Sequence, residues 1–192
     1  MNSNDIIRIS PVATKAGHTA SLAITRELIL EKARAARESL RRREIHIFHT
    51  GDEDPLQRML NAFQPASYVQ PHRHMDPPKA EAIVVLQGSL GFIGFHDNGS
   101  PDSENTFLAD PAKGVVGFDV RAGVWHTFFA LEPDTVVFEV KAGPYEARAD
   151  KGFAPWAPKE GNPESLSYLA NLEDWFRNRF ELPPRPWLVP GG

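Results

Sequence analysis

The feature that most constrains the fold is a long series of short apolar segments separated by turn-forming residues. Between residues 67 and 143, segments rich in β-branched and aromatic side chains alternate with clusters of Gly, Pro, Asn, Asp and Ser. This pattern is typical of an antiparallel sandwich or barrel and not of packed helices. The strands that it predicts cover residues 67–70, 81–87, 90–96, 115–119, 124–131 and 135–141.

Segments with helical periodicity lie on both sides of this region. Residues 21–43 place apolar side chains at three- and four-residue steps without an interrupting Gly or Pro, and residues 165–179 do so again. Two further strands are predicted over residues 45–48 and 57–63. Residues 144–158 are rich in proline and aromatic side chains, so we expect them to wrap the barrel as an ordered loop.

The expected domain organisation has three parts. A helical extension covers residues 1–43, a β-barrel domain covers residues 44–146, and a wrapping loop and helix cover residues 147–192. A chain of 192 residues fits one ordinary domain with such appended segments. The predicted fold class is therefore mainly β, with a helix before the barrel and a helix after it.

Composition limits the chemistry and the partners. The formal charge of −4 creates no general attraction for phosphate backbones or anionic lipid, so no nucleic-acid partner and no membrane partner are expected. Because cysteine is absent, only histidine and carboxylate remain as the usual strong metal ligands. No apolar run approaches the roughly 20 residues that span a bilayer, and residues 1–9 lack the features of a secretory signal. We therefore expect a cytoplasmic protein that binds a small molecule.

Four residues form the candidate metal site. His72 and His74 are two residues apart, which places both side chains on one face of a strand. Glu81 opens a very apolar strand, where an unpaired carboxylate would be costly to bury. His126 lies in an apolar run where an imidazole needs a polar partner. Each residue alone has an ordinary explanation, as a hydrogen-bonded core residue or a chance surface pair, so the prediction depends on their combination.

The ligand types narrow the choice of metal without fixing it. Three neutral imidazoles and one carboxylate suit Fe(II), Mn(II), Ni(II), Co(II) or Zn(II), and they leave coordination positions open for water or substrate. The sequence therefore predicts one divalent transition metal ion as the cofactor.

The spacing of these residues resembles the two motifs of the cupin family. The residues that carry the resemblance are His72, His74, Glu81, Gly88, Gly123 and His126. The resemblance implies a double-stranded β-helix, also called a jelly-roll barrel, with a metal bound inside by three histidines and one glutamate. The chain departs from the general pattern in the six residues between His74 and Glu81, in Arg121 where a proline is usual, and in Ala130 where an asparagine is common.

A narrower resemblance covers about residues 44–161. The blocks that carry it are residues 57–62, 71–74, 76–79, 125–127, 138–145 and 153–158, which look like the WbuC family of cupin-fold metalloproteins. Relatives of that family are associated with bacterial surface-polysaccharide gene clusters, and the family has no settled substrate. The longer gap before Glu81 is normal for it. Because cupins are commonly dimers and exposed strand edges need protection, we expect a homodimer.

Further polar residues are candidates for substrate binding. Arg73 and Lys79 flank the metal ligands and could attract an anionic substrate; the alternative is that they are simply solvated. Glu139 and Lys141 share one face of their strand, which indicates a site lining the barrel or a salt bridge near its rim. Tyr145 is expected to pack at the barrel mouth.

One strand offers a choice between two polar residues. Arg58 and Asn61 lie on opposite faces of the strand predicted over residues 57–63, so at most one of them points into the barrel.

The leading functional hypothesis is a metalloenzyme that acts on a small, carbohydrate-related metabolite. Oxygenase, isomerase and lyase chemistry all remain open, because an open metal site can support each of them. The alternatives are a metal-dependent ligand-binding or sensing module without catalysis, and a metal that only stabilises the barrel.

Overall fold

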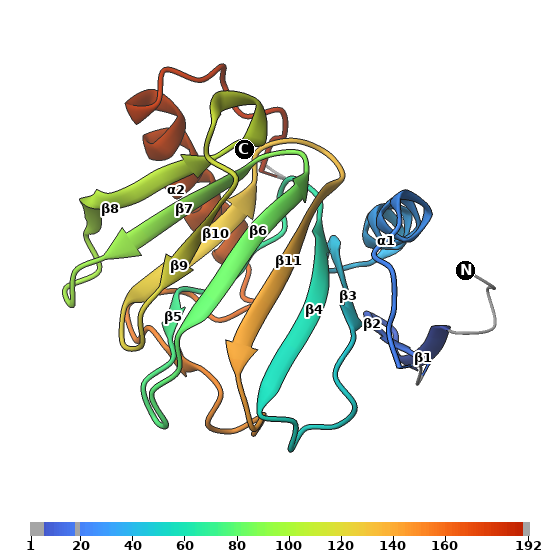
Figure 1. Ribbon diagram of the computed structural model, residues 1–192. Coiled ribbons are helices and arrows are strands. Elements are labelled where there is room, and N and C mark those ends of the chain that lie inside the picture. The colour runs from blue at the N-terminus through green and yellow to red at the C-terminus, as the bar shows by residue number, and fades with distance from the viewer. Residues whose placement is uncertain (1–5, 18–19, 190–192) are drawn as a thin grey trace.

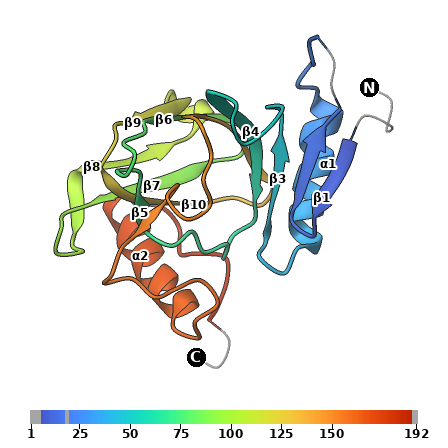
Figure 2. The ribbon, with the colours of Figure 1, turned by 90° about the horizontal axis from the view of Figure 1, so that it is seen from below.

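Two β-sheets face each other and enclose a common interior in the computed structural model, which describes residues 6–17 and 20–189 (Figure 1). The larger sheet has seven strands in the order β1-β2-β3-β4-β11-β6-β9, and the smaller has five in the order β12-β5-β10-β7-β8. All neighbouring strands are antiparallel except β2 and β3, which run parallel. Figure 2 shows the sheets from below, with α1 beside one and α2 beside the other.

The elements follow one another as the alternation of strands and turns predicts. Their bounds are β1 Ile6–Ser10, β2 Ala13–Ala16, α1 Arg26–Glu38, β3 Arg43–Ile47, β4 Leu56–Phe63, β5 His72–Arg73, β6 Glu81–Gln87, β7 Leu90–Phe95, β8 Pro101–Ala109, a 3₁₀ turn Pro111–Lys113, β9 Gly117–Val120, β10 Trp125–Ala130, β11 Thr135–Ala142, β12 Gly152–Phe153 and α2 Ser165–Arg179.

The core of the barrel lies between the two sheets. Ile83 and Val137 of the larger sheet are fully buried and pack in one cluster with Phe92 and Phe128 of the smaller sheet. Along β6 buried and more exposed residues alternate, because successive side chains of a strand point to opposite faces. The same alternation brings polar side chains of other strands into the interior.

Helix α1 covers the outer face of the larger sheet. Its buried side chains, which include Leu28 and Ala36, pack in one cluster with Leu60 of β4 and Val136 of β11. Thr25 caps the helix by accepting a hydrogen bond of 3.3 Å from the backbone N–H of Leu28. The helix therefore stiffens the sheet whose inner face carries site residues.

Helix α2 covers the smaller sheet. Phe176 is fully buried and meets Phe129 of β10 edge to face, with ring centroids 5.3 Å apart. Leu169 and Leu172 belong to the same cluster. Among the described residues, no helix is long and apolar enough to cross a membrane.

The predicted fold class is confirmed: the chain is mainly β, with a jelly-roll barrel, a helix before it and a helix after it. The strands predicted over residues 81–87, 90–96, 124–131 and 135–141 are present, and their ends differ by at most one residue. These segments combine strong alternation with clear turn residues, which explains the agreement.

Several boundaries were predicted wrongly. The N-terminal helix does not run over residues 21–43, because Thr25 caps its start and the chain leaves it at Ser39 to enter β3 at Arg43. Residues 67–70 form no strand and instead lead into the short strand β5. Strand β9 begins two residues later than expected.

Some strands were not expected at all. β1 and β2 extend the larger sheet through the parallel pairing of β2 with β3, although the segment before residue 43 was expected to be helical. β8 begins in a polar stretch that reads as a loop, and its pairing with β7 stabilises it. β12 lies inside the loop that was expected to wrap the barrel, and pairs with β5.

The packing of α1 gives a direct test of this arrangement. Leu28→Ala removes a side chain that is only 2% exposed and should lower the free energy of unfolding by about 2–5 kcal/mol, because a cavity forms beneath the helix. Leu30→Ala, on the same helix but 44% exposed, should change it by less than about 1 kcal/mol. Urea unfolding measures both, and equal effects would contradict the docking of α1.

Candidate metal centre

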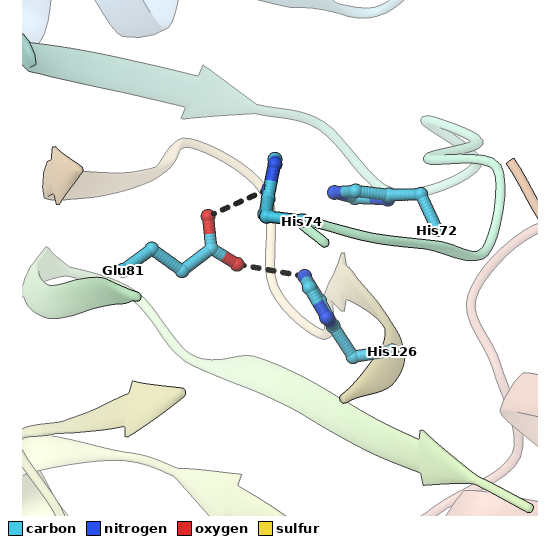
Figure 3. Close-up of side chains that lie close together, drawn as sticks. All are labelled: His72, His74, Glu81 and His126. Atoms are coloured by element: carbon cyan, nitrogen blue, oxygen red, sulfur yellow. Dashed lines mark ion pairs between the residues drawn. The ribbon is translucent and has the colours of Figure 1, made fainter. Parts of the chain in front are cut away.

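Three histidines and one glutamate converge inside the barrel from different segments of the chain (Figure 3). His72 lies on β5, His74 directly follows that strand, Glu81 is the first residue of β6, and His126 lies on β10. Each offers a ligand atom, and these atoms all lie within 4.8 Å of one another. None of the four residues is more than 3% exposed.

Strand pairing brings the four residues together. His126 and His72 are directly paired across β10 and β5, and their ring centroids are 4.5 Å apart. His74 shares the inward face with His72, as the two-residue spacing predicts, and these ring centroids are 5.1 Å apart. Glu81 approaches from the opposite sheet, where its Cα partner on β11 is Lys141.

Hydrogen bonds fix which nitrogen of each imidazole faces the centre. In all three rings Nδ1 bonds to a backbone carbonyl, which can only accept, so Nδ1 carries the proton and Nε2 presents a lone pair. The bonds join His72 to the carbonyl of Gln70 at 2.9 Å, His126 to that of Val124 at 2.9 Å, and His74 to that of Asp150. This orientation is typical of histidines that ligate metals.

The inward-facing atoms lack partners in the part of the chain that the structure describes. Nε2 of His74, Nε2 of His126 and Oε1 of Glu81 are buried and make no hydrogen bond. Oε1 of Glu81 lies 2.7 Å from Nε2 of His126, and Oε2 lies 3.4 Å from Nε2 of His74, without the geometry of hydrogen bonds. A buried carboxylate this close to imidazole nitrogens needs positive charge beside it, either from a further proton on an imidazole or from a bound metal ion, and the four residues fit a divalent metal ion.

The local electrostatics favour the protonation states that ligate metals. Burial lowers the pKa of His72 well below its usual value, so this ring is neutral. Burial by itself raises the pKa of Glu81, but positive charge on His126 and hydrogen bonds from His126 and His74 outweigh it and hold that pKa well below its usual range, so this carboxylate is ionised. A bound metal ion would take the place of those protons. Neutral imidazole and ionised carboxylate are the forms that a metal ion needs.

A cavity of about 490 Å³ lies near the four residues, although none of them is among the residues that line it. It is lined by the inner faces of β3, β4 and β11 and by part of the segment 145–153, which includes Asp150 and Phe153. The Phe153 ring lies 6.4 Å from the His72 ring, and the Asp150 carbonyl accepts from His74. The volume is in the range of pockets that bind small molecules.

Three of the candidate substrate-binding residues line this cavity: Glu139, Lys141 and Tyr145. Lys79 is buried, and its ammonium donates to the Pro144 carbonyl and lies 3.4 Å from Oδ1 of Asp150. Arg73 is half-buried and does not line the cavity, since its guanidinium stacks 4.2 Å from the centroid of the Trp125 ring. Trp125 thus holds Arg73 away from the cavity.

The interior polar residues form two connected groups. Asn61 donates a hydrogen bond of 2.7 Å to Oε2 of Glu139, and Lys141 pairs with Asp150 at 2.6 Å. Burial and the neighbouring charge of Glu81 raise the pKa of Glu139. Burial alone would raise the pKa of Asp150, but Lys141 lowers it, so the Lys141–Asp150 pair is ionised.

The sequence predicted only some of the polar residues around the cavity. Asn61 is the inward residue of the pair that alternation restricted to one, and Arg58 instead pairs with Asp54 at 3.3 Å. Asp150 and Lys151 lie beyond the last long strand, in a segment without periodicity or motif. No local signal in the sequence marks them as interior residues.

Comparison with known proteins shows partial similarity in fold and does not assign the chain to a family. A family model described as "Domain of unknown function (DUF6016)" matches residues 24–107, which is under half of the chain. No curated protein matches.

Several solved structures are similar in part. KdgF from Halomonas sp. is 20% identical with a TM-score of 0.42, over 55% of this chain and 82% of that one. The capsular polysaccharide assembling protein CapF from Staphylococcus aureus is 18% identical with a TM-score of 0.46, over 57% of this chain and 28% of that one. A cupin 2 domain-containing protein from Halorhodospira halophila is 10% identical with a TM-score of 0.42, over 69% of this chain and 81% of that one. At these values the fold assignment rests on the strand order described above.

Loss of one imidazole tests the metal centre. His126→Ala should weaken metal binding by at least about a hundredfold, because removing a ligand costs more than removing one of its supporting hydrogen bonds. His96→Ala, at an exposed histidine outside the cluster, should leave binding unchanged. Competition with a chelator, followed by elemental analysis of untagged protein, measures the difference. Equal metal retention in the two variants would contradict the assignment.

Proposed function

We propose that the protein is a cupin-fold metalloenzyme that binds one divalent transition metal ion and acts on a small, carbohydrate-related metabolite. The ligands are His72, His74, Glu81 and His126. The observation that carries the proposal is the convergence of imidazole lone pairs and a buried carboxylate beside a cavity of about 490 Å³. Fe, Mn, Zn, Ni and Co all suit this ligand set.

A divalent ion held by these residues would supply Lewis-acid chemistry, a bound water of lowered pKa or, if redox-active, electron transfer. Three histidines and one glutamate leave coordination positions free, which supports substrate access more than a purely structural role. Oxygenase, isomerase and lyase reactions are each compatible with this arrangement.

The chain's own residues supply the remaining functions of an active site. Glu139 is buried in the cavity wall with a raised pKa, which suits it to hold a proton and transfer it to or from a substrate. Asn61 orients its carboxyl group by donating to Oε2. The apolar side chains of Phe63, Val69 and Phe128 also line the cavity and limit the entry of water.

The carbohydrate class rests on the resemblance to WbuC proteins, which we propose as the chain's relatives. Parts of the resembling blocks line the cavity, including Tyr145 and Phe153. Together with the association of WbuC relatives with surface-polysaccharide genes, this favours a sugar-derived substrate. Tyr145 is 39% exposed and offers an aromatic face with a hydroxyl group, which suits contact with a polar metabolite.

Turnover tests the enzymatic role. We expect metal-loaded protein to convert a member of a panel of sugars and sugar-derived metabolites, and Glu139→Gln to lower kcat by about a hundredfold or more with metal content unchanged. Glu132→Gln, at an exposed carboxylate, should keep full activity. Product formation is followed by NMR. Metal-dependent binding without any turnover would replace this proposal by a ligand-binding or sensing module.

We also propose that the protein is a homodimer. Apolar side chains are exposed on and beside the outer face of β6, where Val84 is 44% exposed, Leu86 38% and Val116 59%. Pairing between chains would cover this surface. Sedimentation at micromolar concentration should give the mass of two chains, and the mass of one chain would refute the dimer.

A further inference from the structure

The cavity beside the metal ligands contains a lysine without a protein partner. Lys151 lines the cavity, and among the described residues nothing pairs with its ammonium group by a hydrogen bond or an ion pair. The two neighbouring lysines, Lys141 and Lys79, do have a carboxylate partner. Lys141 lies 2.6 Å from Asp150, and Lys79 lies 3.4 Å from the same carboxylate. Asp150 is thus engaged by both, and Lys151 is left free.

The position of Lys151 is fixed by the backbone on both sides. The carbonyl of the preceding residue, Asp150, accepts the Nδ1 proton of His74. The two following residues form β12, in which Phe153 pairs with His72. Lys151 therefore lies between two backbone contacts to metal-site histidines.

The electrostatic influence of Lys151 extends to the metal cluster. Burial lowers the pKa of Lys151, Lys141 lowers it further, and Glu139 and Glu81 oppose this effect. Lys151 in turn contributes to the lowered pKa of His72. An anion bound at this ammonium would therefore interact electrostatically with the metal ligands.

The charges around the cavity are not balanced once a metal is present. Near the metal ligands, three ammonium groups on Lys79, Lys141 and Lys151 accompany three carboxyl groups on Glu81, Glu139 and Asp150. Elsewhere in the cavity wall, the two guanidinium groups of Arg41 and Arg43 accompany the carboxyl groups of Asp52 and Glu160. They compensate one another when all are ionised, which leaves the two positive charges of a divalent ion. Protonation of Glu139 would increase this excess. Partly buried charge without a counter-charge is costly, so the site favours a negatively charged ligand.

We infer that the ligand of this cavity is a small organic acid whose carboxylate binds the ammonium group of Lys151 beside the metal ion. This inference rests on the proposed metal site, and it adds the chemical class of the substrate. A single unpaired ammonium matches the single charge of a carboxylate, whereas a phosphate dianion usually takes several donors. Glu139 and Asn61, farther along the same wall, can hydrogen-bond the hydroxyl groups of such an acid.

The test compares acids with uncharged counterparts of the same shape. Calorimetry on Mn(II)-loaded protein measures the Kd of glycolate against glycolamide and of gluconate against glucose, with inorganic phosphate as a further ligand. We expect at least one acid to bind about tenfold or more tightly than its uncharged counterpart and than phosphate, as a charge-assisted hydrogen bond predicts. Lys151→Gln should remove this preference without weakening the binding of the uncharged compound.

Controls separate this inference from the metal proposal. Lys159→Gln, at an exposed lysine outside the cavity, should bind like the unaltered protein. Metal content and melting temperature are measured on the same samples. A protein that does not bind the metal is therefore recognised whether or not it binds an acid. If the metal is retained, three results overturn the inference: equal Kd values within both pairs, tighter binding of phosphate, or an acid preference that survives Lys151→Gln. Absence of binding by both acids at millimolar concentration also overturns it.

Discussion

A buried carboxylate that faces the lone pairs of imidazoles is the constraint on which the site depends. Glu81 is 3% exposed, and its Oε1 lies 2.7 Å from Nε2 of His126, which carries no proton when Nδ1 donates to a carbonyl. Two acceptors at this distance repel each other unless a cation lies between them. The barrel holds them in place through β5, β6 and β10, so a further proton on an imidazole or a bound metal ion is needed to offset the cost of this arrangement.

The segment after β11 joins the metal centre to the cavity. The backbone of Asp150 orients His74, while its carboxylate binds Lys141 and Lys79. Two residues later, β12 pairs with β5 and fixes the far side of the same segment. The same segment thus contacts two metal-site histidines through its backbone and lines the cavity with its side chains. The metal centre and the cavity form one structural unit.

Much of this site could be predicted from the sequence because its strongest signals are local. The spacing of His72 and His74 fixes their common face, and alternation along the strand lets only one of Arg58 and Asn61 point inward, which is Asn61. Long-range pairing could not be predicted in this way. β8 begins with polar residues and is stabilised by β7, β2 is stabilised by β3, and Asp150 and Lys151 directly precede β12, which pairs with β5. Each of these segments is held in place by the strand that it pairs with or precedes, so its own sequence shows no periodic pattern that would predict its position.

The most direct test of the central claim is anomalous diffraction from crystals of protein purified without a polyhistidine tag, recorded on both sides of the absorption edge of the bound metal. The account predicts one anomalous peak at about 2.0–2.2 Å from Nε2 of His72, His74 and His126 and from a carboxylate oxygen of Glu81. An ordered cluster without a peak in metal-supplemented crystals, or a peak only at other residues, would contradict it.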